Sequence, residues 1–344
     1  MQLSAIRTGF VVTALVAVAA ACAGTGAPTS STGSSAPGST NSGGVAGEIL
    51  VSGSSTVEPV SQAVSEDFRA INPNFGFTVE GPGTGDGFAL FCEGTSDVAN
   101  ASRAIRDSEA ELCATNGIEY TELKIAYDGM AVLTHPDTPI DCLTFADLYA
   151  LFGPESDNVN TWQAAQQLAA ELGSTTQFPD LALQITAPGE ESGTYDSFIE
   201  LALAGTAEGR QQEVFLRVPG PNYTASGNDN VIVEGIEAGA GSLGFVGFAF
   251  YEEAGDEVKA IAIDEAGDGT CVEPTAESIA DGSYPLSRPL FIYPNNAKAE
   301  ANAALSAWVD FYLSDEGIAN VAEVGYVALP DSELEMSRQA WQGR

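Results

Sequence analysis

The stretch ILVSGSSTVEP, residues 49–59, decides how this chain folds. Its apolar start predicts a strand at residues 49–51, and apolar residues at helical spacing predict a helix over residues 57–70. Between the two lie a glycine and the hydroxyl residues Ser54, Ser55 and Thr56. Hydroxyl groups before a helix are typical N-caps, while the free N–H groups of a helix N-terminus also attract anions. We expect Ser54, Ser55 and Thr56 either to act only as a helix cap or to form one wall of an anion-binding site.

The same order of strand, glycine-containing loop and helix recurs twice. A strand at 75–80 leads into the loop GPGTGDG, and a strand at 181–186 leads into the loop GEESGTY before a helix at 196–204. Glycines let a backbone approach a ligand closely. The candidate anion donors in these loops are Thr84, Ser192, Gly193 and Thr194. Flexible or capping turns are the alternative interpretation, and the chain has no Gly-Lys-Ser/Thr run of the Walker type.

The charge balance excludes several classes of partner. The chain has 344 residues, with 48 acidic and 12 basic side chains and a formal net charge of -36. Such a chain repels nucleic acid and anionic lipid, so neither is an expected partner. A hydrophobic content of 44% is sufficient for a core, and the length fits one large or two medium domains.

Two charged residues stand out against this background. Arg103 follows Ser102 directly, in a chain with few basic residues, and is either a surface ion-pair partner or a fork for an anion. Asp128 lies inside an apolar run that predicts a strand over residues 123–134. A carboxylate there is either part of a capped turn or a deliberate hydrogen-bond acceptor.

The first 46 residues predict export and tethering. The apolar segment at 10–21 is too short to span a membrane, and it ends in Ala-Ala-Ala before Cys22. Residues 1–22 therefore resemble a bacterial lipoprotein signal with Cys22 as the lipidation site, and plain secretion is the alternative. Residues 23–46 are almost wholly Gly, Ser, Thr, Ala and Pro, which is typical of a flexible tether.

The four remaining cysteines predict two disulfides in an exported chain. Three pairings are possible. We favour Cys92–Cys113 with Cys142–Cys271, because the first pair closes a short local loop. The cysteines lack Cys-x-x-Cys spacing, so we expect no metal site and no cofactor.

Strands alternate with helices along the chain, which predicts α/β layers. Further expected helices cover residues 107–114, 145–152, 160–173, 231–238, 297–313 and 332–341. Further expected strands cover residues 96–101, 244–251, 259–263 and 289–293.

A set of motifs in fixed order gives these loops a family resemblance. The motifs are SGSSTVEP (52–59), DVANASRAI (97–105), the Asp128 strand, EESGTYDSF (190–198), YTASGNDNVIV (223–233), LSRPLFI (286–292) and GYVALPD (325–331). Together, over about residues 47–344, they resemble the phosphate-binding proteins of ABC phosphate uptake systems, and most closely the branch found in cyanobacteria.

The resemblance implies a two-lobed periplasmic-binding-protein fold of type II, with phosphate in the cleft and two hinge strands between the lobes. Lobe 1 would comprise residues 47–131 and 288–344, and lobe 2 residues 132–287. The implied ligand donors are Ser54, Ser55, Thr56, Thr84, Ser102, Ser192, Gly193 and Thr194.

This sequence departs from the family pattern at two places. The best-known branch of the family has a carboxylate near Ser102 and an arginine before the Ser-Gly-Thr loop. This chain has Ser102-Arg103 at the first place and Pro188 at the second. We expect Arg103 to supply the cation and Asp128 the carboxylate. Glu191 and Asp86 are the rival carboxylates.

The expected function is high-affinity capture of inorganic phosphate by a monomer and delivery to an ABC permease, without catalysis. Contact with the membrane would be through the lipid anchor only. Another tetrahedral oxyanion such as sulfate is the alternative ligand. An exported phosphatase or other hydrolase is the alternative class, although the chain has one histidine and no metal-ligand cluster in its sequence.

Overall fold

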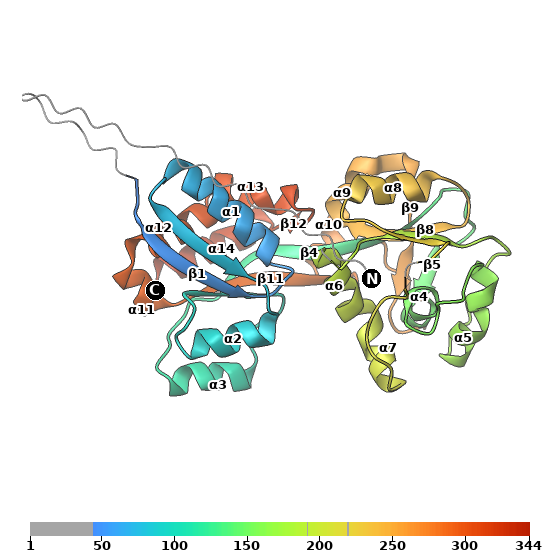
Figure 1. Ribbon diagram of the computed structural model, residues 1–344, viewed down its shortest axis with the longest axis horizontal. Coiled ribbons are helices and arrows are strands. Elements are labelled where there is room, and N and C mark those ends of the chain that lie inside the picture. The colour runs from blue at the N-terminus through green and yellow to red at the C-terminus, as the bar shows by residue number, and fades with distance from the viewer. Residues whose placement is uncertain (1–43, 191, 219) are drawn as a thin grey trace, which may run out of the picture. The chain divides into compact units, whose positions relative to one another are not determined.

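The structure, a computed structural model, describes residues 44–190, 192–218 and 220–344 (Figure 1). The predicted signal segment with Cys22, nearly all of the tether and Glu191 therefore lie outside the described residues. Within the described ranges, the helices all fall short of the length and apolarity needed to cross a membrane.

The first lobe is built on three parallel strands in the order β2-β1-β3. These strands are β1 (Gly47–Gly53), β2 (Phe75–Glu80) and β3 (Val98–Ala101). The helices of this lobe are α1 (Glu58–Ile71), α2 (Thr84–Cys92), α3 (Asp107–Thr115), α11 (Asn296–Ala301), α12 (Ala303–Tyr312), α13 (Asp315–Glu323) and α14 (Asp331–Gln342). Because the three strands are parallel, their carboxyl ends lie at the same edge of the sheet. The loops that follow the strands therefore meet at this edge.

Local contacts hold this edge together. The N–H of Gly83 donates to the carbonyl of Gly53 (2.9 Å), and the N–H of Ser54 donates to the carbonyl of Asn100 (2.9 Å). Beneath them, the predicted apolar face of α1 is buried, with Trp308 of α12 in the same core. These contacts therefore fix the position of the loop at residues 53–57 on the edge of the sheet.

The second lobe has its own parallel strands, with β6 between β8 and β7. The strands are β6 (Gln184–Ala187), β7 (Tyr223–Ala225), β8 (Ser242–Gly247) and β9 (Lys259–Ala260), and β5 (Cys142–Thr144) pairs with β10 (Ala262–Asp264) in a small separate sheet. The helices are α4 (Phe145–Phe152), α5 (Gln166–Glu171), α6 (Gly193–Phe198), α7 (Ala204–Gly209), α8 (Asp229–Glu237), α9 (Phe248–Ala254) and α10 (Ala276–Ala280). Short 3-10 helices cover Trp162–Ala165 and Gly255–Glu257, and a π-helix covers Ile199–Leu203.

Stacked aromatic rings fix α6 in this lobe. The rings of Phe198 and Phe245 lie parallel with centroids 3.9 Å apart, and Phe152 packs edge-on against Phe198 at 5.1 Å. All three side chains are buried. The helix α6, which follows the predicted loop GEESGTY (189–195) and includes its last residues, is thereby anchored to β8 and α4.

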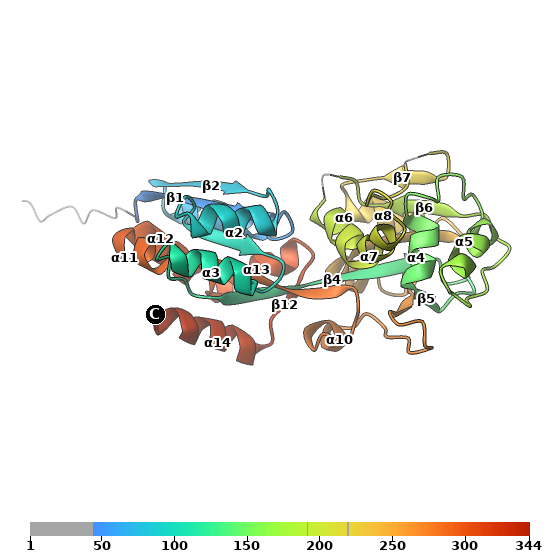
Figure 2. The ribbon, with the colours of Figure 1, turned by 90° about the horizontal axis from the view of Figure 1, so that it is seen from below.

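One long strand, β4 (Leu123–Thr134), belongs to both lobes. Residues 123–129 pair with β11 (Ser287–Pro294), while residues 130–134 pair with β8. Figure 2 shows β4 passing from one lobe into the other. The strand also pairs with β12 (Val327–Ala328) on the first-lobe side and with β9 on the second-lobe side. The change of partner at residues 129–130 lies close to the expected lobe boundary, whose exact position stays a prediction.

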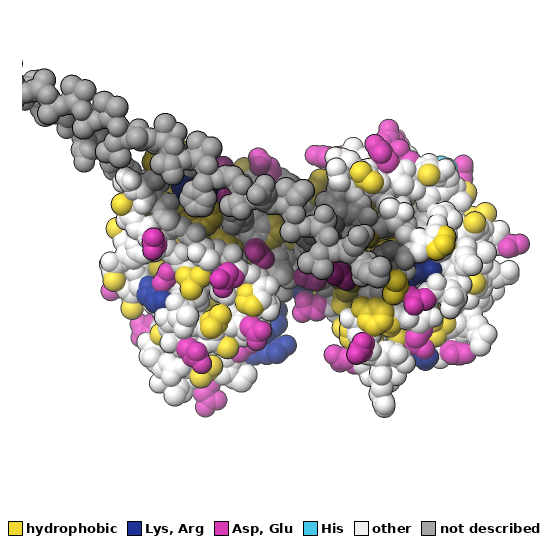
Figure 3. All heavy atoms as spheres, viewed as in Figure 1, with side chains coloured by type: hydrophobic (Ala, Val, Ile, Leu, Met, Phe, Trp, Pro, Cys, Tyr) yellow, Lys and Arg dark blue, Asp and Glu magenta, His cyan; other side chains and the backbone are white. Residues whose placement is uncertain are grey.

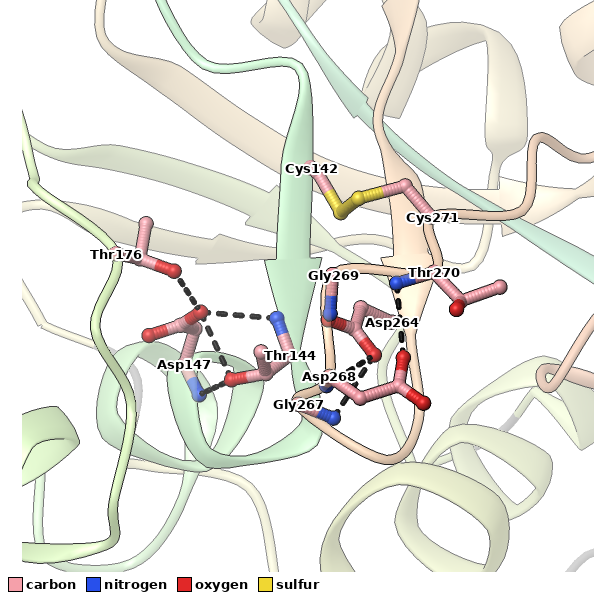
Figure 4. The surroundings of a disulfide bond; sticks show 10 residues. All are labelled: Cys142, Thr144, Asp147, Thr176, Asp264, Gly267, Asp268, Gly269, Thr270 and Cys271. Carbon is pink, nitrogen blue, oxygen red and sulfur yellow. Dashed lines mark hydrogen bonds between the residues drawn. A yellow bond between two sulfur atoms is a disulfide. The ribbon is translucent and has the colours of Figure 1, made fainter.

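The structure pairs the cysteines as predicted. Cys92–Cys113 joins α2 to α3, and Cys142–Cys271 joins β5 to the segment after β10. Beside the second disulfide, the carboxylate of Asp264 accepts backbone N–H groups from the turn that follows it, including those of Gly267 and Gly269 (Figure 4). This turn brings residue 271 back to β5.

Several predicted elements differ from the observed ones; the strand expected over 259–263, for example, is divided into β9 and β10, which lie in different sheets. The strand expected over 244–251 ends at residue 247, and its aromatic half forms α9 instead, because a short apolar run does not separate strand from helix. The helix expected over 297–313 is divided at Asn302, whose side chain caps α12 by accepting the N–H of Ala304. The segment 160–173 becomes α-helical only from residue 166.

Candidate functional site

The loop at residues 53–57 keeps its hydroxyl groups free of helix capping. The carbonyl of Ser54 accepts the N–H groups of Val57 (3.2 Å) and Glu58 (3.0 Å), and the N-cap of α1 makes no side-chain hydrogen bond. The expected side-chain cap is therefore wrong. As a consequence, the hydroxyl groups of Ser55 and Thr56 are available to groups outside their own helix.

Both hydroxyl groups reach the second lobe. Ser55 Oγ donates to Asp196 Oδ2 (2.8 Å), and Thr56 Oγ1 lies 3.2 Å from Ser197 Oγ. The approach is close enough that a Cβ at Gly193 would stand only 3.4 Å from the Cα of Thr56. The first turn of α6 and the first-lobe loop thus form two walls of one site.

The predicted second-lobe donors lie in this wall. Ser192 is the N-cap of α6, and its Oγ accepts the N–H of Thr194 (3.2 Å). Ser197 donates to the carbonyl of Gly193 (2.9 Å). Because Ser192 accepts in the cap, its own hydroxyl hydrogen remains available to a ligand.

A buried arginine and a buried aspartate lie at the base of these walls. Arg288 of β11 and Asp128 of β4 are direct cross-strand neighbours, with Arg288 Nε 3.3 Å from Asp128 Oδ2. Their side chains are 8% and 0% exposed. The pair stands one residue from the point where β4 changes its partner, so it sits on the strands that connect the lobes.

The guanidinium of Arg288 contacts both lobes at once. Its Nη2 lies 2.9 Å from Thr56 Oγ1 and 2.9 Å from Ser197 Oγ, and its Nη1 donates to the carboxylate of Glu200. Burial acts to lower the pKa of Arg288, but the charges of Asp128 and Glu200 outweigh burial and raise it. The group is therefore a fixed cation at the centre of the site.

Asp128 has a free acceptor. Burial raises the pKa of this carboxyl, against the opposing effects of Arg288 and Ser197. Its Oδ1 is buried and has no hydrogen-bond partner among the described residues. A carboxylate oxygen in this position can accept a hydrogen bond from a protonated oxygen of a ligand, and it would repel an unprotonated one.

The remaining predicted residues lie at the same sheet edge but outside this cluster. Thr84 and Ser102 contact each other through their hydroxyl groups (3.1 Å), and the N–H of Ser102 donates to Thr84 Oγ1 (3.2 Å). Arg103 forks onto the carboxylate of Glu109 with distances of 2.8 and 2.7 Å. Asp86, a rival carboxylate, is exposed on α2.

A pocket opens between the two loops. Its volume is about 480 Å³, and the hydroxyl residues Ser55 and Ser192 are part of its wall. The residues that line it are Ser55, Glu58, Pro59, Gln62, Gly81, Glu190, Ser192, Gly193 and Asp196. Elsewhere, acidic side chains are spread over the visible face of the molecule rather than gathered in one patch (Figure 3).

Arg288 and its second-lobe partners Ser197 and Glu200 were not predicted as site residues from the sequence. Arg288 lies within the motif LSRPLFI, which we used as a family signature without assigning a role to its arginine. A basic residue inside an apolar strand of a strongly acidic chain is the signal that would have found it. Its partners are 88 to 232 residues away in sequence, so no local pattern identifies them.

Comparisons with known proteins agree with this architecture. The family model of the PBP superfamily domain matches residues 34–316. Protein SphX of Synechococcus elongatus is 38% identical over 284 residues, which cover 82% of this chain and 77% of that protein. Phosphate-binding protein PstS of Staphylococcus saprophyticus is 32% identical over 299 residues, covering 86% and 85%.

A solved structure from Planctomyces limnophilus, described as "a possible phosphate binding protein", superposes with a TM-score of 0.76 at 36% identity. The match covers 87% of this chain and 99% of that one. The fold, the order of the motifs and these matches lead to one conclusion: the chain belongs to the PBP superfamily, in the family of the proteins named SphX and PstS.

Proposed function

We propose that this protein binds inorganic phosphate outside the cytoplasm and delivers it to an ABC permease. The observation that carries the proposal is the buried Arg288–Asp128 pair, which lies on the connecting strands between hydroxyl groups of both lobes. A relative that is 32% identical is named a phosphate-binding protein, which supports the same ligand here.

The arrangement suits a small tetrahedral anion. Arg288 supplies a forked cation, Ser55 and Thr56 supply hydroxyl donors from one wall, and Ser192 supplies one from the other. The backbone N–H groups at the start of α6 add donors without adding charge. An anion that bonds to both walls takes over the role of the present cross-lobe bonds, so the bound anion itself holds the lobes together.

Asp128 gives the site a means of rejecting sulfate. Phosphate carries one or two protons near neutral pH, whereas sulfate carries none. An ionised Asp128 can accept a hydrogen bond from phosphate but faces only a bare oxygen of sulfate. This role rests on the free, fully buried Oδ1 atom.

Phosphate calorimetry on phosphate-free protein, with sulfate as the second ligand, tests the proposal. We expect saturable one-to-one binding of phosphate and no competition by equimolar sulfate. Equal affinity for the two anions would favour the alternative ligand class. Release of phosphate from a phosphate monoester by the purified chain would favour the hydrolase class instead.

Anchoring and assembly complete the proposal. Cys22 would carry the lipid, residues 23–46 would form the tether, and the protein would act as a monomer at the outer face of the cell membrane. Mass spectrometry of protein from the membrane fraction would detect the lipid on residue 22. Light scattering during gel filtration would report the mass of the detergent-free, unlipidated form.

A further inference from the structure

Two carboxylates of the second lobe occupy donors that the proposed function assigns to phosphate. Asp196 accepts the hydroxyl of Ser55, and Glu200 accepts Nη1 of Arg288. Both carboxylates come from one stretch of chain, four residues apart, where α6 continues into the π-helix Ile199–Leu203. Residues with this spacing lie on one face of a helix, so the two acids point at the site together.

We infer that Asp196 and Glu200 form an internal ligand pair that competes with phosphate and sets the affinity of the site. The inference rests on the proposed function, because it concerns the same donors. Neither Asp196 nor Glu200 contacts the bound phosphate in this scheme. They hold the donors and the lobes together, and an incoming anion must displace them.

The exposure of the groups makes displacement feasible. Asp196 is exposed and the side chain of Glu200 is 60% exposed, so both carboxylates can turn into water at little cost. Of the two donors, in contrast, Arg288 is buried and Ser55 is partly buried. The donors are thus more confined than the competing acceptors, which is the arrangement that an exchange of acceptors requires.

The π-helical turn supports a functional role for Glu200. Wide turns of this kind cost helix stability and occur frequently at functional sites. Here the turn begins at Ile199, directly before the acid that reaches Arg288. Glu208 lies further along the same run of helix, in α7, and is exposed. It has no contact with the arginine in the structure and provides a matched control.

Competition of this kind lowers the apparent affinity for phosphate in proportion to the fraction of molecules whose donors are not occupied by the two carboxylates. Removing both charges should therefore tighten binding of any anion that uses these donors, and it should leave the preference between anions unchanged. Substitution of a residue that contacts the bound anion would instead change the preference between anions.

The test is calorimetry with phosphate, and with sulfate in competition, on the full chain and on Asp196→Asn, Glu200→Gln, the double variant and Glu208→Gln. We expect the double variant to bind phosphate about tenfold more tightly, each single variant to fall between, and Glu208→Gln to match the parent chain. Unchanged or weaker phosphate binding by the double variant, or a changed preference against sulfate, overturns the inference.

A second measurement needs no ligand. Small-angle X-ray scattering on phosphate-free protein should give a larger radius of gyration for the double variant than for the parent chain, because the carboxylates no longer hold the lobes together. Equal radii overturn the inference. If the parent chain binds no phosphate, the proposed function fails, and this measurement still decides whether the two acids act as a latch.

Discussion

Arg103, in the loop after β3, and Arg288, on β11, are the same residue type in two regions of the molecule, yet their guanidinium groups have different partners. Arg103 forks onto Glu109, only six residues away, and its side chain is 24% exposed. Arg288 is 8% exposed and contacts groups 88, 91, 160 and 232 residues away. An arginine with one local partner stabilises its own element, whereas an arginine whose partners are distant in sequence assembles a site.

The largest effect should follow from Arg288→Ala. Truncation leaves the buried charge of Asp128 without its cation, and we expect a loss of about 3–5 kcal/mol in the free energy of unfolding. Phosphate affinity should fall by about 100-fold or more, since a central charged partner is lost. Chemical denaturation and calorimetry measure the two effects.

Arg288→Lys separates binding from folding. Lysine keeps the positive charge beside Asp128 but cannot fork to Thr56 and Ser197 at the same time. We therefore expect most of the stability to return while phosphate affinity stays reduced. Full affinity in this variant would show that charge alone suffices and that the fork has no role.

Asp128→Asn should have the next largest effect, on selectivity. The amide can turn a donor toward a bare oxygen, so the penalty against sulfate disappears. Leaving a buried group mismatched costs about 1–3 kcal/mol, which corresponds to a change of about 5- to 150-fold in the ratio of the two affinities. Competition calorimetry gives this ratio. If it does not move, the acceptor lies elsewhere, and Glu191 or Asp86 becomes the next residue to test.

Arg103→Ala should have a small effect that is confined to stability. The pair with Glu109 lies near the surface, and we expect a loss of about 0.5–1 kcal/mol in the free energy of unfolding. Phosphate affinity should stay within experimental error, in contrast to Arg288→Ala. Arg106→Ala is the matched control, since it removes the same charge three residues away without breaking the fork. A clear loss of affinity specific to Arg103→Ala would return this residue to the site.

The smallest effect is the pH dependence of the Arg103–Glu109 pair. Burial acts to raise the pKa of Glu109, but the bonds from Arg103 and from the N–H of Arg106 outweigh it and leave the pKa below its ordinary value. Stability from this pair is therefore present above the ordinary glutamate pKa and is lost as the pH falls through the lowered one. Melting curves between neutral and acidic pH should show a slightly shallower acid decline in Arg103→Ala than in the parent chain.

Much of the fold could be predicted because its signals are local. The expected bounds of β2, β4 and α4 coincide with the observed ones, since each depends on the spacing of apolar residues within a single element. The break at Asn302 was missed because an asparagine inside a long apolar pattern gives little warning that it caps a new helix. The turn from β8 into α9 was missed because apolar residues fit both elements.

The site could be predicted only in part. The loops that carry Ser55, Thr56 and Ser192 follow from their glycine and hydroxyl pattern, and all three residues lie at the junction of the lobes. Which hydroxyl groups cap a helix and which face the other lobe depends on tertiary approach: Ser192 caps α6, while Ser55 and Thr56 do not cap α1. The pairing of Asp128 with Arg288 depends on the register of two strands separated by 160 residues, which no local pattern contains.

That register has a mechanical consequence. β4 leaves β11 at Gly129 and joins β8 at Met130, so the backbone torsions around these residues form the pivot between the lobes. A side chain at Gly129 would crowd this pivot, because a Cβ there would stand 2.6 Å from Ile279 Cδ1 of α10, which would have to move. Arg288, the cation proposed to bind the anion, thus lies directly beside the segment of β4 about which the lobes would rotate. Anion binding and lobe opening then depend on the same backbone torsions. A change there that strengthens binding of the anion should also slow its release.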